Sequence, residues 1–392
     1  MNMREKMTAI ELLEKLVSFK TVSRDSNLDL INFVEEYLNS FGIHSHKVYD
    51  STGEKAAIYA NIGPKSQGGI ILSGHSDVVP VDGQDWNTDP FKLVKKDELY
   101  YGRGASDMKG FLACALAAVP DMIKANLAKP IQIAISYDEE VGCLGAPNMI
   151  KSMREKIPIA DIAIIGEPTM MKVVNSHKGI SLLETHVKGF EVHSSMVDKG
   201  VSAVMTASRL IGWLTNEMEK NSTKSKSSQN IFAEPFDPPY TTLHIGKISG
   251  GTAANITAKD CSFSTDIRVV PGESMSDWIE KYKNEAKRVE GLIKKINKDS
   301  SIAVNVKSET PGCKPEIDGK AEALVRAVTG DNSTNVVAYG TEGGQFQEAG
   351  YSAVICGPGN IAQAHQPNEF ISASQISKGE EFIKDIISRQ AS

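Results

Sequence analysis

The sequence predicts an α/β domain that is interrupted by a smaller, inserted α+β domain. Helix-like and strand-like segments alternate from residue 9 to residue 166, which is typical of a sheet flanked by helices. The order of the segments changes after Lys178-Gly179, and the alternation returns beyond Pro311. The chain has 392 residues, of which 41% are hydrophobic, so it is long enough to form two domains with separate cores.

The first part of the chain begins with two predicted helices, at residues 9–16 and 28–41, where apolar residues recur at helical spacing. Short apolar runs next to turn residues then predict strands at 57–60 and 69–74. The pattern continues with a helix at 110–125, a strand at 131–137, a helix at 145–154 and a strand at 162–166. This succession predicts one sheet with helices packed against it.

The middle of the chain has a different order of predicted elements: a strand at 180–188, a helix at 201–219, strands at 241–248 and 261–270, a helix at 275–296 and a strand at 302–307. Residues 219–230 are polar and predict a mobile surface loop. Beyond Pro311 the first pattern returns, with a helix at 321–329, strands at 335–338 and 352–355, and a final helix. The two ends of the chain are therefore expected to form one domain.

The charge and the apolar runs restrict the class of partner. Lys plus Arg number 43 and Asp plus Glu number 49, so the net charge of −6 offers no basic surface for nucleic acid or an anionic membrane. The N-terminus has no apolar signal core, and the longest apolar run, near residues 111–119, is too short to cross a bilayer. We therefore predict a soluble, cytoplasmic protein that acts on a small molecule.

Metal-competent side chains occur in five turn-like segments. The five cysteines are scattered and form no CxxC pair, so a metal site must use histidine and carboxylate ligands. Residues at the carboxyl ends of strands in an open α/β sheet converge in space, and four of the five segments follow predicted strands. Two imidazoles and several carboxylates suit zinc or cobalt, and two metals sharing one carboxylate fit the count. The segments contain His75 and Asp77, Asp107, Glu139 and Glu140, Glu167, and His365.

Taken together, these motifs resemble the acetylornithine deacetylase and succinyl-diaminopimelate desuccinylase family of di-zinc amidohydrolases, along nearly the whole chain. The resemblance implies a zinc-peptidase-like catalytic domain, with a mixed sheet flanked by helices, formed by residues 1–178 and 310–392. It also implies that residues 179–309 form a ferredoxin-like lid and dimerisation domain. The motifs most similar to the acetylornithine deacetylases are His177-Lys178-Gly179, residues 250–255, residues 266–272, Thr341-Glu342, Gly357-Pro358-Gly359 and residues 365–369.

The resemblance also assigns roles at a site for two zinc or cobalt ions per subunit. Glu139 would be the general base, taking a proton from a water whose pKa the metals lower and later giving it to the leaving amine. Asp77 would accept the imidazole N–H of a ligand histidine, although a turn-capping role fits it too. A non-proline cis peptide is implied between Asp107 and Met108. The metal ligands would be His75 and Glu167 for one ion, Glu140 and His365 for the other, and Asp107 as the bridge.

The remaining implied site residues lie mostly in the insert. His193 would be supplied by the partner subunit of a homodimer and would stabilise the charge that develops on the carbonyl oxygen. Arg268 and Asn255 would bind substrate, since an arginine fork suits an α-carboxylate, although Asn255 also fits a turn. Glu342 would contact the side-chain ammonium of the substrate, or else belong to an ordinary turn.

The expected reaction is metal-dependent hydrolysis of the amide bond of an N-acyl amino acid, and N-acetylornithine is the first substrate to test. A desuccinylase, an aminoacylase or a dipeptidase of the same family would use the same metal residues. A non-catalytic metal- or peptide-binding relative is expected to lack a ligand or the base. This sequence retains Glu139 and all five ligand positions.

Overall fold

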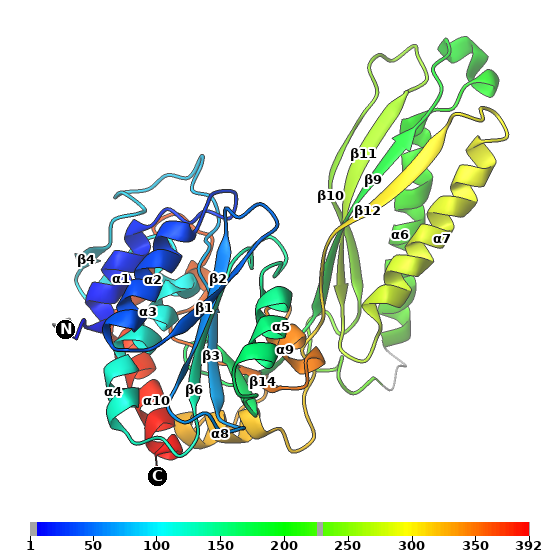
Figure 1. Cartoon of the computed structure of the whole chain (residues 1–392). Helices are drawn as coiled ribbons and strands as arrows, with labels where there is room; N and C mark the ends of the chain where they lie inside the picture. Colours follow the sequence, from blue (N-terminus) through cyan, green and yellow to red (C-terminus); the bar gives the residue numbers. More distant parts are fainter. Residues whose placement is uncertain (1–5, 226–229, 392) are drawn as a thin grey trace. The chain divides into compact units, whose positions relative to one another are not determined.

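The protein consists of two compact units (Figure 1). The computed structural model describes residues 6–225 and 230–391. The first unit comprises Met1–Ser176, Pro315–Val336 and Thr341–Ser392, and the second comprises His177–Lys314 and Val337–Gly340. The second unit is therefore an insertion that also takes in four residues from the later part of the chain.

The first unit is built on an eight-stranded mixed sheet. Its centre is parallel, because β6, β3, β7 and β14 run in the same direction, whereas β2 and β8 are antiparallel to their neighbours. Every residue of β3 and β6 is buried, as expected for parallel strands covered on both faces. In spatial order the strands are β1 (Ser45–Tyr49), β2 (Ala56–Ile62), β6 (Ile131–Ser136), β3 (Ile70–His75), β7 (Ile162–Ile165), β14 (Ser352–Ile355), β8 (Val174–His177) and β13 (Asn335–Val337).

Helices cover both faces of this sheet (Figure 1). Ile70 and Leu72 of β3 belong to the core that the first set of helices covers, while the intervening Ile71 is also buried. The first set is α1 (Ala9–Ser18), α2 (Leu28–Ser40), α3 (Gly110–Ala117), α4 (Val119–Lys124), α8 (Lys320–Thr329) and α10 (Ala373–Gln390). The opposite face is covered by α5 (Ala146–Lys156) and α9 (Gly343–Glu348).

Local sequence explains where two of these helices begin. Helix α1 begins with a capping box, in which the Thr8 side chain accepts from the Glu11 N–H and the Glu11 side chain accepts from the Thr8 N–H. The single helix predicted at residues 110–125 is two helices. Pro120 lies at the start of α4, where its missing N–H costs least, and it separates α4 from α3.

The first unit also contains a small three-stranded sheet. Its strands are β15 (Phe370–Ser372), β5 (Leu99–Tyr101) and β4 (Val94–Lys96), and they are antiparallel. It leads into a short irregular helix, η1 (Ala105–Lys109), which precedes α3. This route brings Asp107 to the edge of the large sheet.

The second unit is a four-stranded antiparallel sheet with two helices on one face. Burial alternates along β9 and β11, because their inward residues pack on α6 and α7 and their outward residues do not. The chain order is β9 (Gly179–Lys188), α6 (Ala203–Ser225), β10 (Thr242–Gly250), β11 (Asp260–Val269), α7 (Met275–Ile293) and β12 (Ser301–Thr310), and the spatial order is β10-β11-β9-β12. This is the ferredoxin-like arrangement.

The polar segment at residues 219–230 differs from its prediction. Helix α6 continues to Ser225, so the beginning of the predicted loop is helical. A polar run is compatible with the end of a helix whose side chains face water, and composition alone does not separate that case from a loop. Residues 226–229 lie outside the described residues.

Two further features bear on the chemistry. All five cysteines are buried, and none of them forms a disulfide bond in the part of the chain that the structure describes. Among the helices of residues 6–225 and 230–391, none has the length and apolar character needed to cross a bilayer.

Candidate metal centre

The candidate site lies in the first unit, at the carboxyl edge of the parallel strands. His75 is the last residue of β3. Glu139 and Glu140 follow the end of β6, and Glu167 follows the end of β7. Because β6, β3 and β7 are neighbours and run parallel, these side chains meet at one edge of the sheet.

Asp107 lies between the two candidate histidine ligands. Its Oδ1 is 3.2 Å from Nε2 of His75, and its Oδ2 is 3.3 Å from Nε2 of His365. On one side, Oε1 of Glu167 is 3.8 Å from Nε2 of His75; on the other, Oε2 of Glu140 is 2.9 Å from Nε2 of His365. The five side chains therefore form two candidate half-sites, one around His75 and Glu167 and one around His365 and Glu140, which share Asp107. The peptide bond between Asp107 and Met108 is cis.

The charge of this cluster suits two divalent cations. When ionised, Asp107, Glu139, Glu140 and Glu167 carry four negative charges in a buried space, and the two imidazoles are neutral in their ligand form. Burial raises the pKa of Glu139 and Glu167 well above the usual value, and raises that of Glu140 to about 7, with neighbouring carboxylates adding to the effect. Bound cations would allow all four to ionise. Nitrogen and oxygen donors of this kind suit zinc and its neighbours among the transition metals.

Two further observations show that the cluster takes up positive charge when no metal is bound. Oε1 of Glu167 is buried and has no hydrogen-bond partner within the described residues. Burial by itself lowers the pKa of His75, but the hydrogen bond to Asp107 and the charges of Glu167 and Glu139 raise it well above its usual value. Hydrogen bonds to Asp107 and Glu140 likewise raise the pKa of His365 to about 10. Protonated histidines thus fill the electrostatic role that cations would take.

Asp77 organises the site in a different way from the one expected. Nδ1 of His75 donates to the main-chain carbonyl of Asp77 at 2.9 Å, whereas its carboxylate Oδ1 is 3.6 Å away. The carboxylate instead accepts the backbone N–H groups of Glu139, at 3.1 Å, and Glu140, at 3.3 Å, and the hydroxyl of Ser23 at 2.8 Å. The short spacing of residues 75 and 77 favours the carbonyl contact, so the side chain is free to hold the 139–140 turn.

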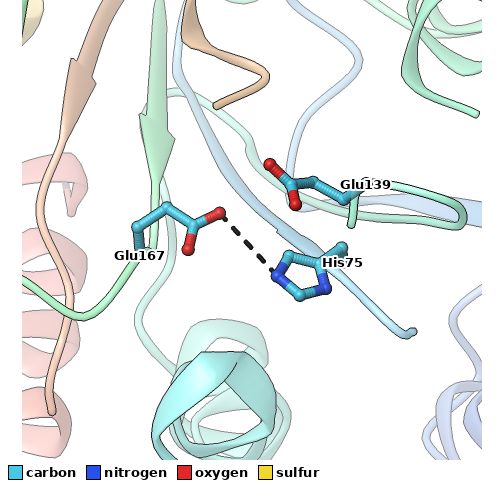
Figure 2. Close-up of side chains that lie close together, drawn as sticks. All are labelled: His75, Glu139 and Glu167. Atoms are coloured by element: carbon cyan, nitrogen blue, oxygen red, sulfur yellow. Dashed lines mark ion pairs between the residues drawn. The ribbon is translucent and has the colours of Figure 1, made fainter. Parts of the chain in front are cut away.

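Glu139 lies close to His75 and Glu167 (Figure 2). Candidate ligand atoms of these three residues lie within 4.8 Å of one another, as do those of His75, Asp107 and Glu140. The Cys143 thiol donates to Oε1 of Glu139 at 3.4 Å. Glu139 is therefore within reach of the first half-site, both for moving a proton there and for binding a metal.

Comparison with known proteins decides the family. The sequence profile of Peptidase family M20/M25/M40 matches residues 71–389. The chain is 33% identical to the acetylornithine deacetylase of Myxococcus xanthus over 372 residues, which cover 93% of this chain and 92% of that one.

The chain belongs to peptidase family M20/M25/M40.

Solved structures of this family share the fold. An M20 family metallo-carboxypeptidase from Sulfolobus solfataricus superimposes with a TM-score of 0.75 at 18% identity, over 97% of this chain and 98% of that one. The Bacillus subtilis YXEP protein, a dinuclear metal binding peptidase from the M20 family, gives a TM-score of 0.63 at 12% identity, over 97% of both chains. Membership of the M20 family and the buried donor set together make the chain a metal-dependent amide hydrolase.

Glu342 lies beneath the metal centre of this M20 family member and is not presented on a surface. It is 1% exposed, and its Oε2 accepts the Ser73 hydroxyl at 3.2 Å. Burial raises the pKa of its carboxyl. Glu342 thus contacts β3 from inside the first unit, and its contact with a substrate ammonium stays a prediction.

In the second unit, the structure brings His193 and Asn255 together. His193 forms an isolated bridge with Ile256, and the Ser194 N–H donates to the Asn255 carbonyl at 2.9 Å. The Ser195 N–H donates to Nδ1 of His193 at 3.2 Å, so the remaining proton of the neutral ring is on Nε2. His193 is exposed and can present this N–H to a ligand.

Arg268 lies at the opposite end of the same sheet. It pairs with Thr242 of β10 and with Ile180 of β9, whereas the end near Asn255 is marked by the pair of Gly250 and Cys261. At roughly 3.4 Å per residue, the rise of β11 separates these two ends by about 24 Å. The Arg268 guanidinium donates to the Asp266 carboxylate at 2.9–3.1 Å, so its fork is already partly engaged.

Sequence reasoning missed two buried residues at the metal centre, Arg103 and Glu369. Both are 1% exposed, and they form an ion pair at 2.8 Å. Glu369 ends the motif that contains His365, and Arg103 lies between Gly102 and Gly104, just before the loop that carries Asp107. Both residues could have been predicted from the sequence, because each is charged and lies next to a loop that carries a candidate metal ligand.

Proposed function

We propose that this chain is a two-metal amidohydrolase that converts N2-acetyl-L-ornithine to L-ornithine and acetate, a step of arginine biosynthesis. The observation that carries the proposal is the position of Asp107, with one carboxylate oxygen facing His75 and the other facing His365. The substrate is proposed from the relatives named acetylornithine deacetylase, which match nearly the full length of the chain. A cytoplasmic location is proposed with it, as for other steps of amino-acid biosynthesis.

Each half-site has its own proposed ligands. His75 and Glu167 would hold one ion, Glu140 and His365 the other, and Asp107 would be shared; zinc or cobalt fits these donors. When bound, such ions make water acidic enough to act as a nucleophile at neutral pH. The dinuclear metal binding peptidase with the same fold supports two ions per chain.

Glu139 is the proposed general base. Its carboxyl lies beside the first half-site, and its backbone N–H is fixed by Asp77 at 3.1 Å. It would take a proton from the attacking water and deliver it to the amine that leaves. Glu140, its neighbour, is directed to His365 at 2.9 Å, so the two adjacent carboxylates have different partners.

His193 and Arg268 are proposed to serve different copies of the site in a homodimer. The second unit joins the first next to Ile180, which pairs with Arg268. Arg268 is thus at the connected end of the sheet, about 24 Å from the end that carries His193 and Asn255. We propose that Arg268 binds the substrate carboxylate in its own chain, while His193 donates its Nε2–H to the carbonyl oxygen in the partner.

Exposed apolar side chains support a dimer through the second unit. Phe190, Met196, Val197, Met205 and Ile256 lie in the segments around His193, and each is 40–59% exposed. Large exposed apolar side chains gathered in one region are typical of surfaces that bind a partner. A two-fold pairing of this region would give each site one His193 from the other chain.

The proposed function is tested by measuring metal content and hydrolysis of a panel of substrates with the same preparation. We expect about two equivalents of zinc or cobalt, and the highest kcat/KM for N2-acetyl-L-ornithine. N-succinyl-diaminopimelate, N-acetylated neutral amino acids and dipeptides serve as the comparison substrates. Preference for one of these would reassign the substrate and leave the two-metal site intact, whereas absence of hydrolysis by metal-loaded protein would reject the proposed activity.

A further inference from the structure

His365 is the one proposed ligand whose side chain is not enclosed by protein. Its side chain is 52% exposed, whereas those of His75, Asp107, Glu140 and Glu167 are at most 7% exposed. Its backbone also has a positive φ of 64°, a conformation that non-glycine residues adopt rarely and that surrounding contacts must maintain. Main-chain contacts therefore help to hold His365 in position, in addition to its side-chain contacts with Asp107 and Glu140.

The main chain of this loop is held by residues 84–87. The Gln84 side chain donates from Nε2 to the His365 carbonyl at 2.9 Å. Asn368, which also has a positive φ of 59°, accepts the Asn87 N–H at 2.8 Å and donates to the Asp85 carbonyl at 3.3 Å. The segment thus holds the His365 loop at both of its positive-φ residues.

Glu369 performs the corresponding task for the Asp107 loop. Its Oε1 accepts the backbone N–H groups of Ser106, at 2.9 Å, and Asp107, at 3.1 Å. Its Oε2 accepts the Gly104 N–H at 3.0 Å. Gly104 has a φ of 81°, and a Cβ there would lie 2.6 Å from a Val78 methyl, so only glycine allows this loop to wrap the carboxylate.

Arg103 connects these two sets of contacts. One guanidinium nitrogen donates to Glu369 at 2.8 Å and to the Gln366 carbonyl at 3.3 Å, and the other donates to Oε1 of Gln84 at 2.5 Å. The guanidinium lies over the Trp86 ring, 5.1 Å from its centre. A planar group with several donors in fixed directions can make all these contacts at once, which a lysine ammonium cannot.

We propose that Arg103 and Glu369 are positioning residues that fix the distance between Asp107 and His365, and so set the metal affinity of the half-site that contains both. The proposal rests on the two-metal site of the proposed function. Residues outside the coordination shell that orient ligands typically change metal affinity by roughly 10–100-fold. The half-site of His75 and Glu167 has buried ligands at strand ends and depends on this pair only through Asp107.

The test is zinc binding by metal-free, full-length protein in competition with a chromophoric chelator, without substrate. His365→Ala and Glu167→Gln identify which binding step belongs to which half-site. In Glu369→Gln we expect the His365 half-site to bind zinc about 10–100-fold more weakly, with a smaller change at the other half-site. Arg103→Lys should weaken the same step about tenfold, since it keeps the charge and loses the fork.

Gln84→Ala tests the same proposal without removing a buried charged group. Gln84 is partly exposed, so this variant should fold, and it should weaken only the His365 half-site, several-fold. Glu322→Gln is the matched control, because Glu322 forms an Arg–Glu pair with Arg326 at the same distance of 2.8 Å in α8, away from the ligands. It should leave both binding steps unchanged.

The outcomes separate the two proposals. Failure of the wild-type protein to bind two zinc ions would reject the two-metal site itself. If the wild type binds two ions but Glu369→Gln and Gln84→Ala leave the His365 step unchanged, or weaken both steps equally, the positioning role is wrong. If Glu369→Gln does not fold, the result for Gln84→Ala decides.

Discussion

The two units carry their polar residues in opposite ways. In the first unit, carboxylates and histidines from distant parts of the sequence are packed together at one strand edge, and four of the five proposed ligands are buried. In the second unit, His193 and Asn255 are exposed, and Arg268 lies at the other end of the sheet. The first unit thus contains a complete cluster, whereas the residues of the second gain a shared function only when another chain or a ligand brings them together.

This difference separates the roles of burial and exposure in the proposed enzyme. Burial raises the pKa of Glu139 and Glu167, so these carboxylates favour bound protons or bound cations. Exposure leaves His193 able to enter and leave a substrate site. The comparison predicts large effects on chemistry from changes in the first unit, and smaller or restorable effects from changes in the second.

Metal removal should have the largest effect. Dialysis against a strong chelator is expected to abolish hydrolysis of N2-acetyl-L-ornithine, and zinc or cobalt should restore it, because the cluster requires cations to activate water. The rate before and after reloading is the measurement. Full activity in protein shown to be free of metal would contradict the claim that the first unit needs bound cations for hydrolysis.

Replacement of Glu139 should lower turnover with little effect on metal content. Glu139→Gln is expected to reduce kcat by roughly 10²–10⁴-fold, the usual contribution of a general base. Glu140→Gln should instead lose one metal, because Glu140 faces His365. Metal analysis alongside kinetics distinguishes the two variants, and equal metal loss in both would show that Glu139 is a ligand.

A partner subunit should be able to supply His193 to a site whose own chain lacks it. His193→Ala is expected to lower kcat by roughly 10²–10³-fold. Subunits carrying His193→Ala, mixed equally with Glu139→Gln subunits, should recover about a quarter of the wild-type sites, since each mixed dimer contains one site with both groups. The control is wild-type protein taken through the same exchange. A mixture that stays inactive after proven exchange would place His193 in its own chain's site or outside it.

Arg268 should have a smaller effect, because Asp266 already engages its fork. Arg268→Lys is expected to raise KM for substrates with an α-carboxylate by about tenfold, while substrates whose carboxylate is amidated should change little. Steady-state kinetics on such a matched pair of substrates measures the effect. Equal losses for both substrates would mean that Arg268 supports the sheet and does not read the carboxylate.

The smallest expected effect is on the stability of the metal-free protein. The pKa of Glu140 is raised from 4.5 to about 7 and that of His365 from 6.5 to about 10, so the folded state holds both protons more tightly than the unfolded chain. Their contribution is complete at low pH and is lost as pH rises through these values. The Tm should therefore fall by roughly a few degrees between pH 6 and 9. The effect is small because His365 is partly exposed to solvent, which screens its charge.

Metal-loaded protein is the control for the pH series. Bound cations displace the protons from Glu140 and His365, so its Tm should lack this decline over the same pH range. Parallel declines in the two forms would mean that other groups dominate the pH dependence.

Much of the fold follows from the sequence, for identifiable reasons. Buried parallel strands such as β3 and β6 are short apolar runs between turn residues, and the helices have clear periodicity. The break between α3 and α4 and the extension of α6 to Ser225 were not predicted, since Pro120 at a helix start and a polar helix end both have local signals that fit two conformations.

The position of a side chain was predictable where it lies at the end of a strand, and less so where it depends on a loop. The convergence of His75, Glu140 and Glu167 was predicted because strand ends converge, whereas their role as metal ligands stays a prediction. The contacts of Asp77, the burial of Glu342 and the Arg103–Glu369 pair depend on loop conformations, and residue type alone does not fix which backbone groups a carboxylate reaches. The sequence alone does not show whether a charged residue is buried or exposed.

The way in which the second unit is attached has a consequence for how such a protein arises and can be rebuilt. The chain leaves the first unit and returns to it through segments that are themselves hydrogen-bonded, since the His177 N–H donates to the Cys313 carbonyl at 3.0 Å and Ile180 pairs with Thr310. The exit and the return are therefore only one strand spacing apart, about 5 Å. A host fold with such a gap can gain or lose an entire module by a single splice, with a short turn closing the gap. A minimal version of this protein, with a few residues in place of residues 179–310 and with Val337–Gly340 kept as a connecting segment, should retain the metal-binding unit as an independent folding unit.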